Sequence, residues 1–121
     1  MSQDIQSVVT FPGVQGTSVG PLIRVPAGYG AWTITKAYIV NDAAATFTAY
    51  LDDLGTALGT AQSATIGTST VANGTFVANV QKALNLVASP VVNEGHWLGL
   101  YVSAGATLAG TRVLIEYAVG K

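Results

Sequence analysis

Few residue types in this chain could support catalysis. It has one histidine, His96, and no cysteine. Histidine is the commonest acid, base and metal ligand near neutral pH, but a lone histidine builds neither a catalytic triad nor a metal site. The chain has no Gly-x-Ser-x-Gly motif that would expose a serine nucleophile. We therefore expect His96 to be packed or hydrogen-bonded near the start of a strand, and the chain not to be an enzyme.

Asp52 and Asp53 are the only adjacent pair among the six carboxylate side chains. Such a pair could do general acid-base work, or could bind Ca²⁺ together with backbone carbonyl oxygens. No EF-hand calcium loop accompanies it, and Asp42 would come near only if the flanking strands formed a hairpin. We interpret the pair as a solvated turn after a strand that ends at Leu51. Asp52 and Asp53 remain a weak calcium candidate, and we expect no cofactor.

The aromatic residues allow two interpretations. Trp32, Trp97 and the tyrosines could form the stacking platforms that carbohydrate-binding sandwiches use. Tryptophan and tyrosine are also enriched between packed sheets and at subunit contacts. We favour packing, and keep as an alternative a lectin-like module that recognises glycans through Trp32 or Trp97, with calcium at the Asp52 and Asp53 pair.

The charge composition predicts a weakly charged surface. Charged residues make up 9% of the chain, against about 25% in typical soluble domains, while apolar residues reach 50% and the net charge is -1. A net charge near zero favours association. The basic residues form no stripe that could neutralise a phosphate backbone, so nucleic acid is not an expected partner. They are Arg24, Lys36, Lys82, Arg112 and Lys121.

Length and segment composition predict one soluble domain of 121 residues. No stretch approaches the roughly 18 apolar residues that a membrane-spanning helix needs, and the N-terminus carries no basic run followed by an apolar core. We expect a product made in a cytoplasm, with no membrane partner. Residues 1–20 form an N-terminal arm or first strand, and residues 21–121 form the main domain.

Glycines and prolines divide the chain into short segments with strand character. The clearest is Thr111 to Val119, where Val113, Ile115, Tyr117 and Val119 fall on one face. On its other face Arg112 and Glu116 would lie about 13 Å apart, so each needs a partner on a neighbouring strand. We expect this strand to pair with His96 to Val102, with residues 103–110 as the connection. Further strands are expected at Ile5 to Phe11, Leu22 to Val25, Ala31 to Val40, and Thr46 to Leu51.

Two regions are harder to assign. Residues 54–73 are rich in Gly, Ser and Thr and predict loops around one short strand near Ala61 to Ile66. Phe76 to Val87 fits both a helix and a strand broken at Lys82, and the surrounding strands favour the strand. About seven or eight short strands with no alternating helices predict an all-β fold, a jelly-roll or related Greek-key β-sandwich of antiparallel strands.

Several strands carry large or apolar residues on both faces. Trp97 and Tyr101 lie on one face of their strand, and Leu98 and Leu100 lie on the other. Leu114 likewise lies on the opposite face of its strand from its neighbours Val113 and Ile115. One face packs against the other sheet, and the opposite face is expected to be covered by another subunit. We therefore predict a homo-oligomer. The interface candidates are Trp32, Trp97, Tyr101 and Leu114.

The overall pattern resembles the small jelly-roll structural proteins of tailed bacteriophages, especially capsid decoration or cement proteins and the head domains of fibres. The likeness covers Pro21 to Val119. The segments that carry it are Pro26-Ala27-Gly28 before Trp32-Thr33-Ile34-Thr35, Thr46 to Leu51, Asn93-Glu94-Gly95 before Trp97-Leu98-Gly99-Leu100, and Gly105 to Gly110 before Val113 to Tyr117.

The resemblance implies a trimer on the capsid surface of a virion, bridging subunits of the major capsid protein and stabilising the phage head. It carries over no functional residue. Met1 to Gly20 would be the candidate for a capsid anchor. An alternative is a tail, baseplate or pilus-like subunit in which the N-terminal strand is exchanged between neighbours.

Overall fold

The computed structural model describes six stretches of the chain. They are residues 5–10, 20–42, 44–57, 64–69, 75–102 and 111–120. Within them the fold is all-β, as predicted, and no helix there is long and apolar enough to cross a membrane. The strands are β1 (Ile5–Thr10), β2 (Gly20–Arg24), β3 (Trp32–Val40), β4 (Ala45–Thr46), β5 (Ala49–Gly55), β6 (Ala64–Ser69), β7 (Thr75–Phe76), β8 (Lys82–Leu86), β9 (Val91–Val92), β10 (Trp97–Val102) and β11 (Arg112–Val119).

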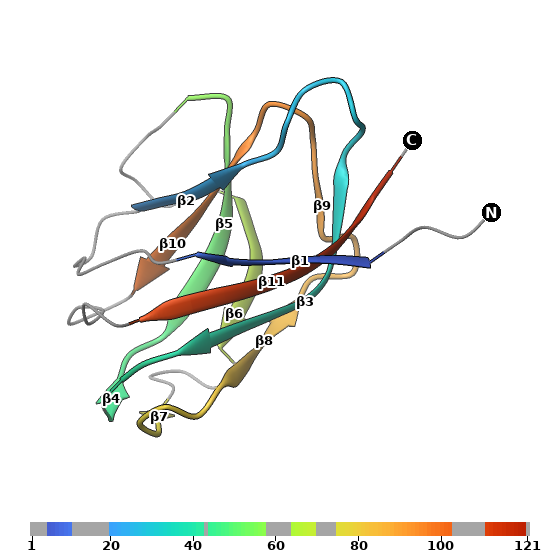
Figure 1. Cartoon of the computed structure of the whole chain (residues 1–121). Coiled ribbons are helices and arrows are strands. Elements are labelled where there is room, and N and C mark those ends of the chain that lie inside the picture. Colours follow the sequence, from blue (N-terminus) through green and yellow to red (C-terminus); the bar gives the residue numbers. More distant parts are fainter. Residues whose placement is uncertain are drawn as a thin grey trace.

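The main strands form one antiparallel sheet that folds into two layers (Figure 1). Its order is β1-β11-β3-β8-β6-β5-β10-β2, with β9 beside β3. We call β1, β11, β3 and β8 the front sheet and β6, β5, β10 and β2 the back sheet; β6 and β8 join them. The short strands β4 and β7 pair separately.

The strand pairing is nested along the chain. β1 pairs with β11, β2 with β10, β3 with β8, and β5 with β6. Four early strands thus pair in reverse order with four late strands. This is the connectivity of an eight-stranded jelly roll, one of the architectures that the sequence predicts.

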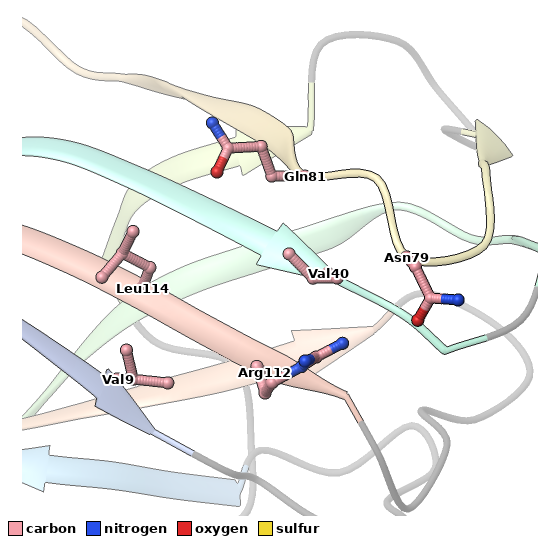
Figure 2. A pocket seen from close by; sticks show the side chains of 6 residues that line it. All are labelled: Val9, Val40, Asn79, Gln81, Arg112 and Leu114. Atoms are coloured by element: carbon pink, nitrogen blue, oxygen red, sulfur yellow. The ribbon is translucent and has the colours of Figure 1, made fainter.

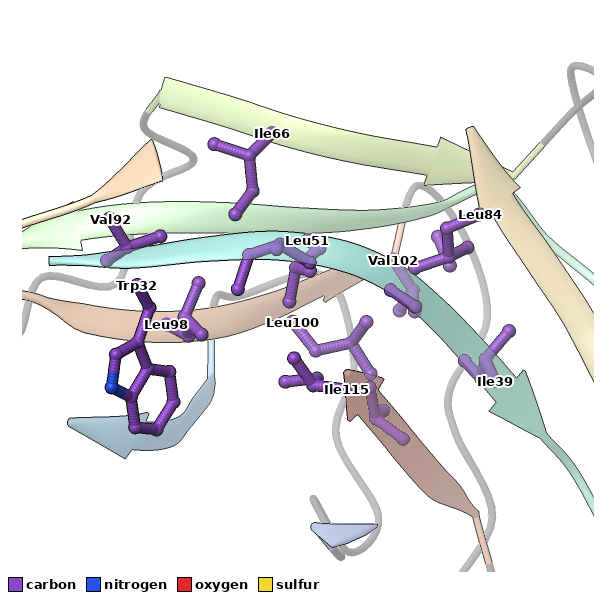
Figure 3. Close-up of a cluster of buried hydrophobic side chains, with 14 of the residues drawn as sticks. Trp32, Ile39, Leu51, Ile66, Leu84, Val92, Leu98, Leu100, Val102 and Ile115 are labelled. Atoms are coloured by element: carbon purple, nitrogen blue, oxygen red, sulfur yellow. The ribbon is translucent and has the colours of Figure 1, made fainter. Parts of the chain in front are cut away.

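The hydrophobic core lies between the two sheets (Figure 3). Alternation in each strand places one face inward, as the pairs Leu51–Leu100 and Ile39–Val113 show, with all four side chains fully buried. Strands β3, β10 and β11 contribute Trp32, Ile34, Ile39, Leu98, Leu100, Val102, Val113 and Ile115 to this core.

A bulge in β3 reverses its alternation without disturbing β11. Glu116 is opposite Lys36 and Tyr117 is opposite Ile34, so Thr35 is the extra residue. Ile34 and Ala37 can therefore both face the core. The predicted inward face of β11 is confirmed, since Tyr117 and Val119 pack against the core beside its buried residues.

The expected hairpin between the last two strands is wrong. β10 pairs with β5 and β2, whereas β11 pairs with β1 and β3, so the two strands lie in different sheets. Alternation reports which face of a strand is buried but does not specify its partner. The expected connection, residues 103–110, lies outside the described residues.

Several strand boundaries also differ from expectation. The single strand predicted from Thr46 to Leu51 is divided between β4 and β5, and β5 continues to Gly55. The strand predicted near Ala61 to Ile66 begins no later than Ala64 and runs to Ser69; residues 61–63 lie outside the description. The strand interpretation of Phe76 to Val87 holds only in part: Phe76 ends β7 and Lys82–Leu86 form β8, whereas residues 77–81 form a turn region, so the break lies before Lys82 and not at it.

Candidate assembly surface

The outward face of the front sheet carries apolar side chains from three neighbouring strands. Val9 of β1 lies opposite Leu114 of β11, which lies opposite Tyr38 of β3. Residues paired in register project from the same face of a sheet. Leu114 and Tyr38 are half-buried and Val9 is 48% exposed. The prediction of apolar residues on both faces is therefore correct for β11, where Val113 and Ile115 are buried beneath Leu114.

A shallow groove of about 420 Å³ lies at one end of this face (Figure 2). Its apolar wall comes from Val9, Val40 and Leu114. Its polar lining comes from Arg112, Asn79 and Gln81. The groove thus combines aliphatic surface with one guanidinium and two side-chain amides.

Among the described residues, Arg112 has no acidic partner at the groove. Its register neighbour on β3 is Val40, and its Nε is buried without a hydrogen-bond partner. In the described part of the chain, the pair Asp53 and His96 is the one contact of an acidic with a basic side chain at ion-pair distance. A buried donor without an acceptor is unfavourable, so this guanidinium is suited to an incoming anion.

Strand β1 forms an open edge of the front sheet. Among the described strands it pairs with β11 alone. Its sequence, IQSVVT, contains no charge and no proline, and Ile5 at its start is 56% exposed. Natural edge strands are usually protected by charged residues, prolines or bulges. β2, the edge of the back sheet, has such features: Pro21, a register shift, and the exposed Arg24.

No known protein family, curated protein or solved structure matches this chain.

The interface candidates separate into different environments. Leu114 lines the groove, as described. Trp97 and Tyr101 are half-buried on β10, in the back sheet, and Tyr101 lies against Tyr50 with ring centroids 5.6 Å apart. The structure therefore does not bring these three candidates together on one face.

Trp32 does not lie at the surface. It is 4% exposed and stacks on Tyr117, with ring centroids 3.7 Å apart and an interplanar angle of 14°. Its role as an interface candidate or glycan platform is corrected to that of a core residue. A tryptophan at the start of a strand fits either environment, so the sequence did not decide between them.

Asp52 and Asp53 lie within β5 and not in a solvated turn. Asp52 is fully buried, and its Oδ1 accepts a hydrogen bond from Oγ1 of Thr65 at 2.8 Å. Asp53 instead faces β10, where its Oδ1 accepts from Nδ1 of His96 at 2.9 Å and from the backbone N–H of Gly55 at 2.9 Å. The turn interpretation failed because the strand continues past Leu51.

These contacts place the two carboxylates against opposite neighbouring strands. To bind both carboxylates, a calcium ion would have to break the hydrogen bond between Asp52 and Thr65 and the hydrogen bond between Asp53 and His96. Across the described ranges, no three His, Asp or Glu side chains gather as a metal site would require. β3 and β5 lie in different sheets, so the hairpin that would have brought Asp42 close does not form.

His96 is hydrogen-bonded immediately before β10, as expected from the sequence. The residues that sequence reasoning missed are Val9, Tyr38 and Val40 on the outward face. A signal for them exists: the adjacent valines Val8 and Val9 give β1 an apolar side chain on each face, as Val113 and Leu114 do for β11. Their neighbours across strands could not be read without the register.

Proposed function

We propose that this chain is a structural, non-enzymatic subunit that associates with copies of itself through the open edge of β1. The observation that carries the proposal is the unprotected character of this edge. Among the described strands β1 is paired on one side only, it carries no charge that would repel an added strand, and Ile5 and Val9 are exposed. An edge of this kind is a template for strand addition.

The low charge of the whole chain supports the same proposal. With 9% charged residues and a net charge of -1, the surface has little repulsion to keep copies apart. At the other edge, Pro21 and Arg24 protect β2. Another copy would therefore add at β1, and polymerisation through β2 is disfavoured. An assembly with one reactive edge per subunit closes more readily than it extends.

Within this structural role, we propose a capsid decoration or cement protein of a tailed bacteriophage, in the form of a trimer on the virion surface. The jelly-roll connectivity agrees with the fold that the resemblance implies. The partner would be the major capsid protein, and the chain would bridge its subunits and stabilise the head. The count of three rests on the resemblance alone, because β1 edges that pair with one another form a two-fold contact and would by themselves give a dimer.

The experiment is light scattering coupled to size-exclusion chromatography across a dilution series. The wild type is compared with Ile5→Lys, which puts a charge on the β1 edge. The matched control is Val77→Lys, the same chemical change at a residue that is 62% exposed outside β1. Circular dichroism confirms that both variants stay folded.

We expect a wild-type oligomer that is lost in Ile5→Lys and kept in Val77→Lys. A trimer supports the capsid decoration form of the proposal and is followed by binding to phage heads that lack their decoration protein. A dimer supports β1 pairing and contradicts the trimer. Growth into long polymers favours the tail or pilus-like alternative. A wild-type monomer at micromolar concentration overturns self-association.

A further inference from the structure

The groove on the front sheet presents two chemically different rows of side chains. In the first row Val9 lies directly opposite Leu114. In the second row Arg112 lies opposite Val40. Figure 2 shows these side chains projecting from adjacent strands around the groove. Leu114 and Arg112 are two residues apart on β11, which in a strand separates the rows by about 6.7 Å.

The second row needs an anion that the described residues do not supply. The Nε of Arg112 is a buried donor without an acceptor. A guanidinium is a planar, permanently charged fork that matches a carboxylate through two parallel hydrogen bonds. The carboxylate of Glu116 projects from the same face of β11, but two strand repeats away, about 13 Å along the chain. Arg112 is therefore prepared to bind a carboxylate from outside the described residues.

We propose that this groove binds an extended segment of a partner protein in which an acidic and an aliphatic side chain stand two residues apart. In an extended chain, residues i and i+2 project to the same side at about 6.7 Å, the same spacing as the two rows. The carboxylate contacts Arg112 while the aliphatic side chain covers Val9 and Leu114.

The remaining lining suits the backbone of such a segment. Asn79 and Gln81 are exposed at the groove and carry both amide donors and carbonyl acceptors. Asn79 is held in a left-handed conformation, φ 62°, and its N–H donates to the carbonyl of Asn41 at 2.7 Å. Its backbone is thus fixed at the rim. The proposal rests on the structural role given above, because a subunit of a larger assembly needs an anchoring contact besides the contact between its copies.

The test uses the ¹⁵N-labelled full chain and three peptides, followed by NMR. The first, acetyl-Val-Thr-Glu-Thr-Val-amide, places valines two residues from the glutamate in either binding direction. The second replaces Glu by Gln and removes only the charge. The third, acetyl-Thr-Val-Glu-Val-Thr-amide, has the composition of the first but turns its valines to the opposite side. The Nε–Hε signal of Arg112 reports directly on a new acceptor.

Two protein variants accompany the peptides. Arg112→Gln removes the guanidinium, and Val9→Thr replaces the apolar wall by a β-branched residue of similar shape on the exposed side of β1. Thermal unfolding of both is recorded. If Arg112→Gln does not fold, Val9→Thr and the Gln peptide still test the site.

We expect the first peptide to shift the Arg112 Nε–Hε signal and to bind about tenfold more tightly than the other two peptides, since a charge-assisted hydrogen bond and a correct register are lost in them. If the Gln peptide binds equally well, the groove does not recognise a carboxylate. If the third peptide binds equally well, the proposed two-residue spacing is wrong. If octanoate binds at Arg112 and the first peptide does not, the groove is a site for a small amphiphile, and the proposal that it binds a protein segment is wrong.

Light scattering on the same samples separates this proposal from the proposed function. An oligomer that ignores the peptide overturns the groove proposal and leaves self-association standing. A monomer whose Arg112 signal responds to the first peptide supports the groove and overturns self-association through β1.

Discussion

Oγ1 of Thr111 donates a hydrogen bond to Oδ1 of Asn41 at 2.8 Å, and both residues are fully buried. The contact ties the residue before β11 to the residue after β3. The backbone carbonyl of Asn41 also accepts from the N–H of Asn79. Thr111 is next to Arg112, Asn41 is next to Val40, and Asn79 itself lines the groove. These two hydrogen bonds, both made by the buried Asn41, therefore hold the rim of the groove.

Thr111→Val tests the hydrogen bond between Thr111 and Asn41. The substitution keeps the shape of the side chain but removes the hydroxyl donor, leaving the buried Oδ1 of Asn41 without that hydrogen bond. We expect the free energy of unfolding to fall by about 1–3 kcal/mol, measured by urea denaturation. Thr33→Val, at a half-buried threonine near the start of β3, is the control. Equal stability of Thr111→Val and the wild type would show that this hydrogen bond does not hold the rim.

Asn41 also shows the limit of sequence reasoning for this fold. Followed by Asp42 after a β-rich segment, it is a turn signal that ends the strand. The structure buries it completely, because the ends of β3 and β11 meet there. The local residue type predicted the end of the strand correctly, but the neighbour that buries Asn41 is Thr111, far along the chain.

The buried face of a strand could be predicted from the sequence, whereas the pairing of the strands could not. Alternation in Thr111 to Val119 predicts the strand and its buried face, since both depend on nearby residues. Pairing is a property of the whole chain, and the jelly roll places β10 and β11 in opposite sheets even though they are consecutive. The groove combines Val9 with Arg112 and Asn79, so its composition follows only from the register. Arg112 was recognised as needing a cross-strand partner, and that partner is the uncharged Val40.

Trp32→Ala is expected to damage the core and not a surface contact. The indole is buried and stacks on Tyr117, so its removal leaves a cavity and an unstacked ring. We expect a loss of about 3–5 kcal/mol in the free energy of unfolding. Trp97 remains as the fluorescent reporter for urea denaturation.

Two further variants control this prediction. Tyr117→Phe keeps the ring that stacks on Trp32 and should preserve most of the stability. Tyr29→Ala removes an aromatic side chain that is 65% exposed, and should change stability by less than about 0.5 kcal/mol. If Trp32→Ala kept full stability but dissociated the oligomer, Trp32 would belong to an interface and the core assignment would be wrong.

The hydrogen bond between Asp53 and His96 is expected to stabilise the junction of β5 and β10. A double-mutant cycle with Asp53→Asn, His96→Gln and the double variant measures their coupling free energy by urea denaturation. We expect about 1 kcal/mol, typical of contacting polar residues that keep some access to solvent. Asp42→Asn, at an exposed carboxylate, serves as the control for loss of charge alone.

The same cycle decides whether Asp53 serves the fold or a metal ion. Because Asp53 already accepts from His96 and from the N–H of Gly55, while Asp52 faces Thr65, calcium would have to compete with formed hydrogen bonds. We expect the thermal midpoint of the wild type to be the same in millimolar calcium and in EDTA. A calcium-dependent rise that disappears in Asp53→Asn, together with a coupling energy near zero, would instead assign the carboxylates to a cation site.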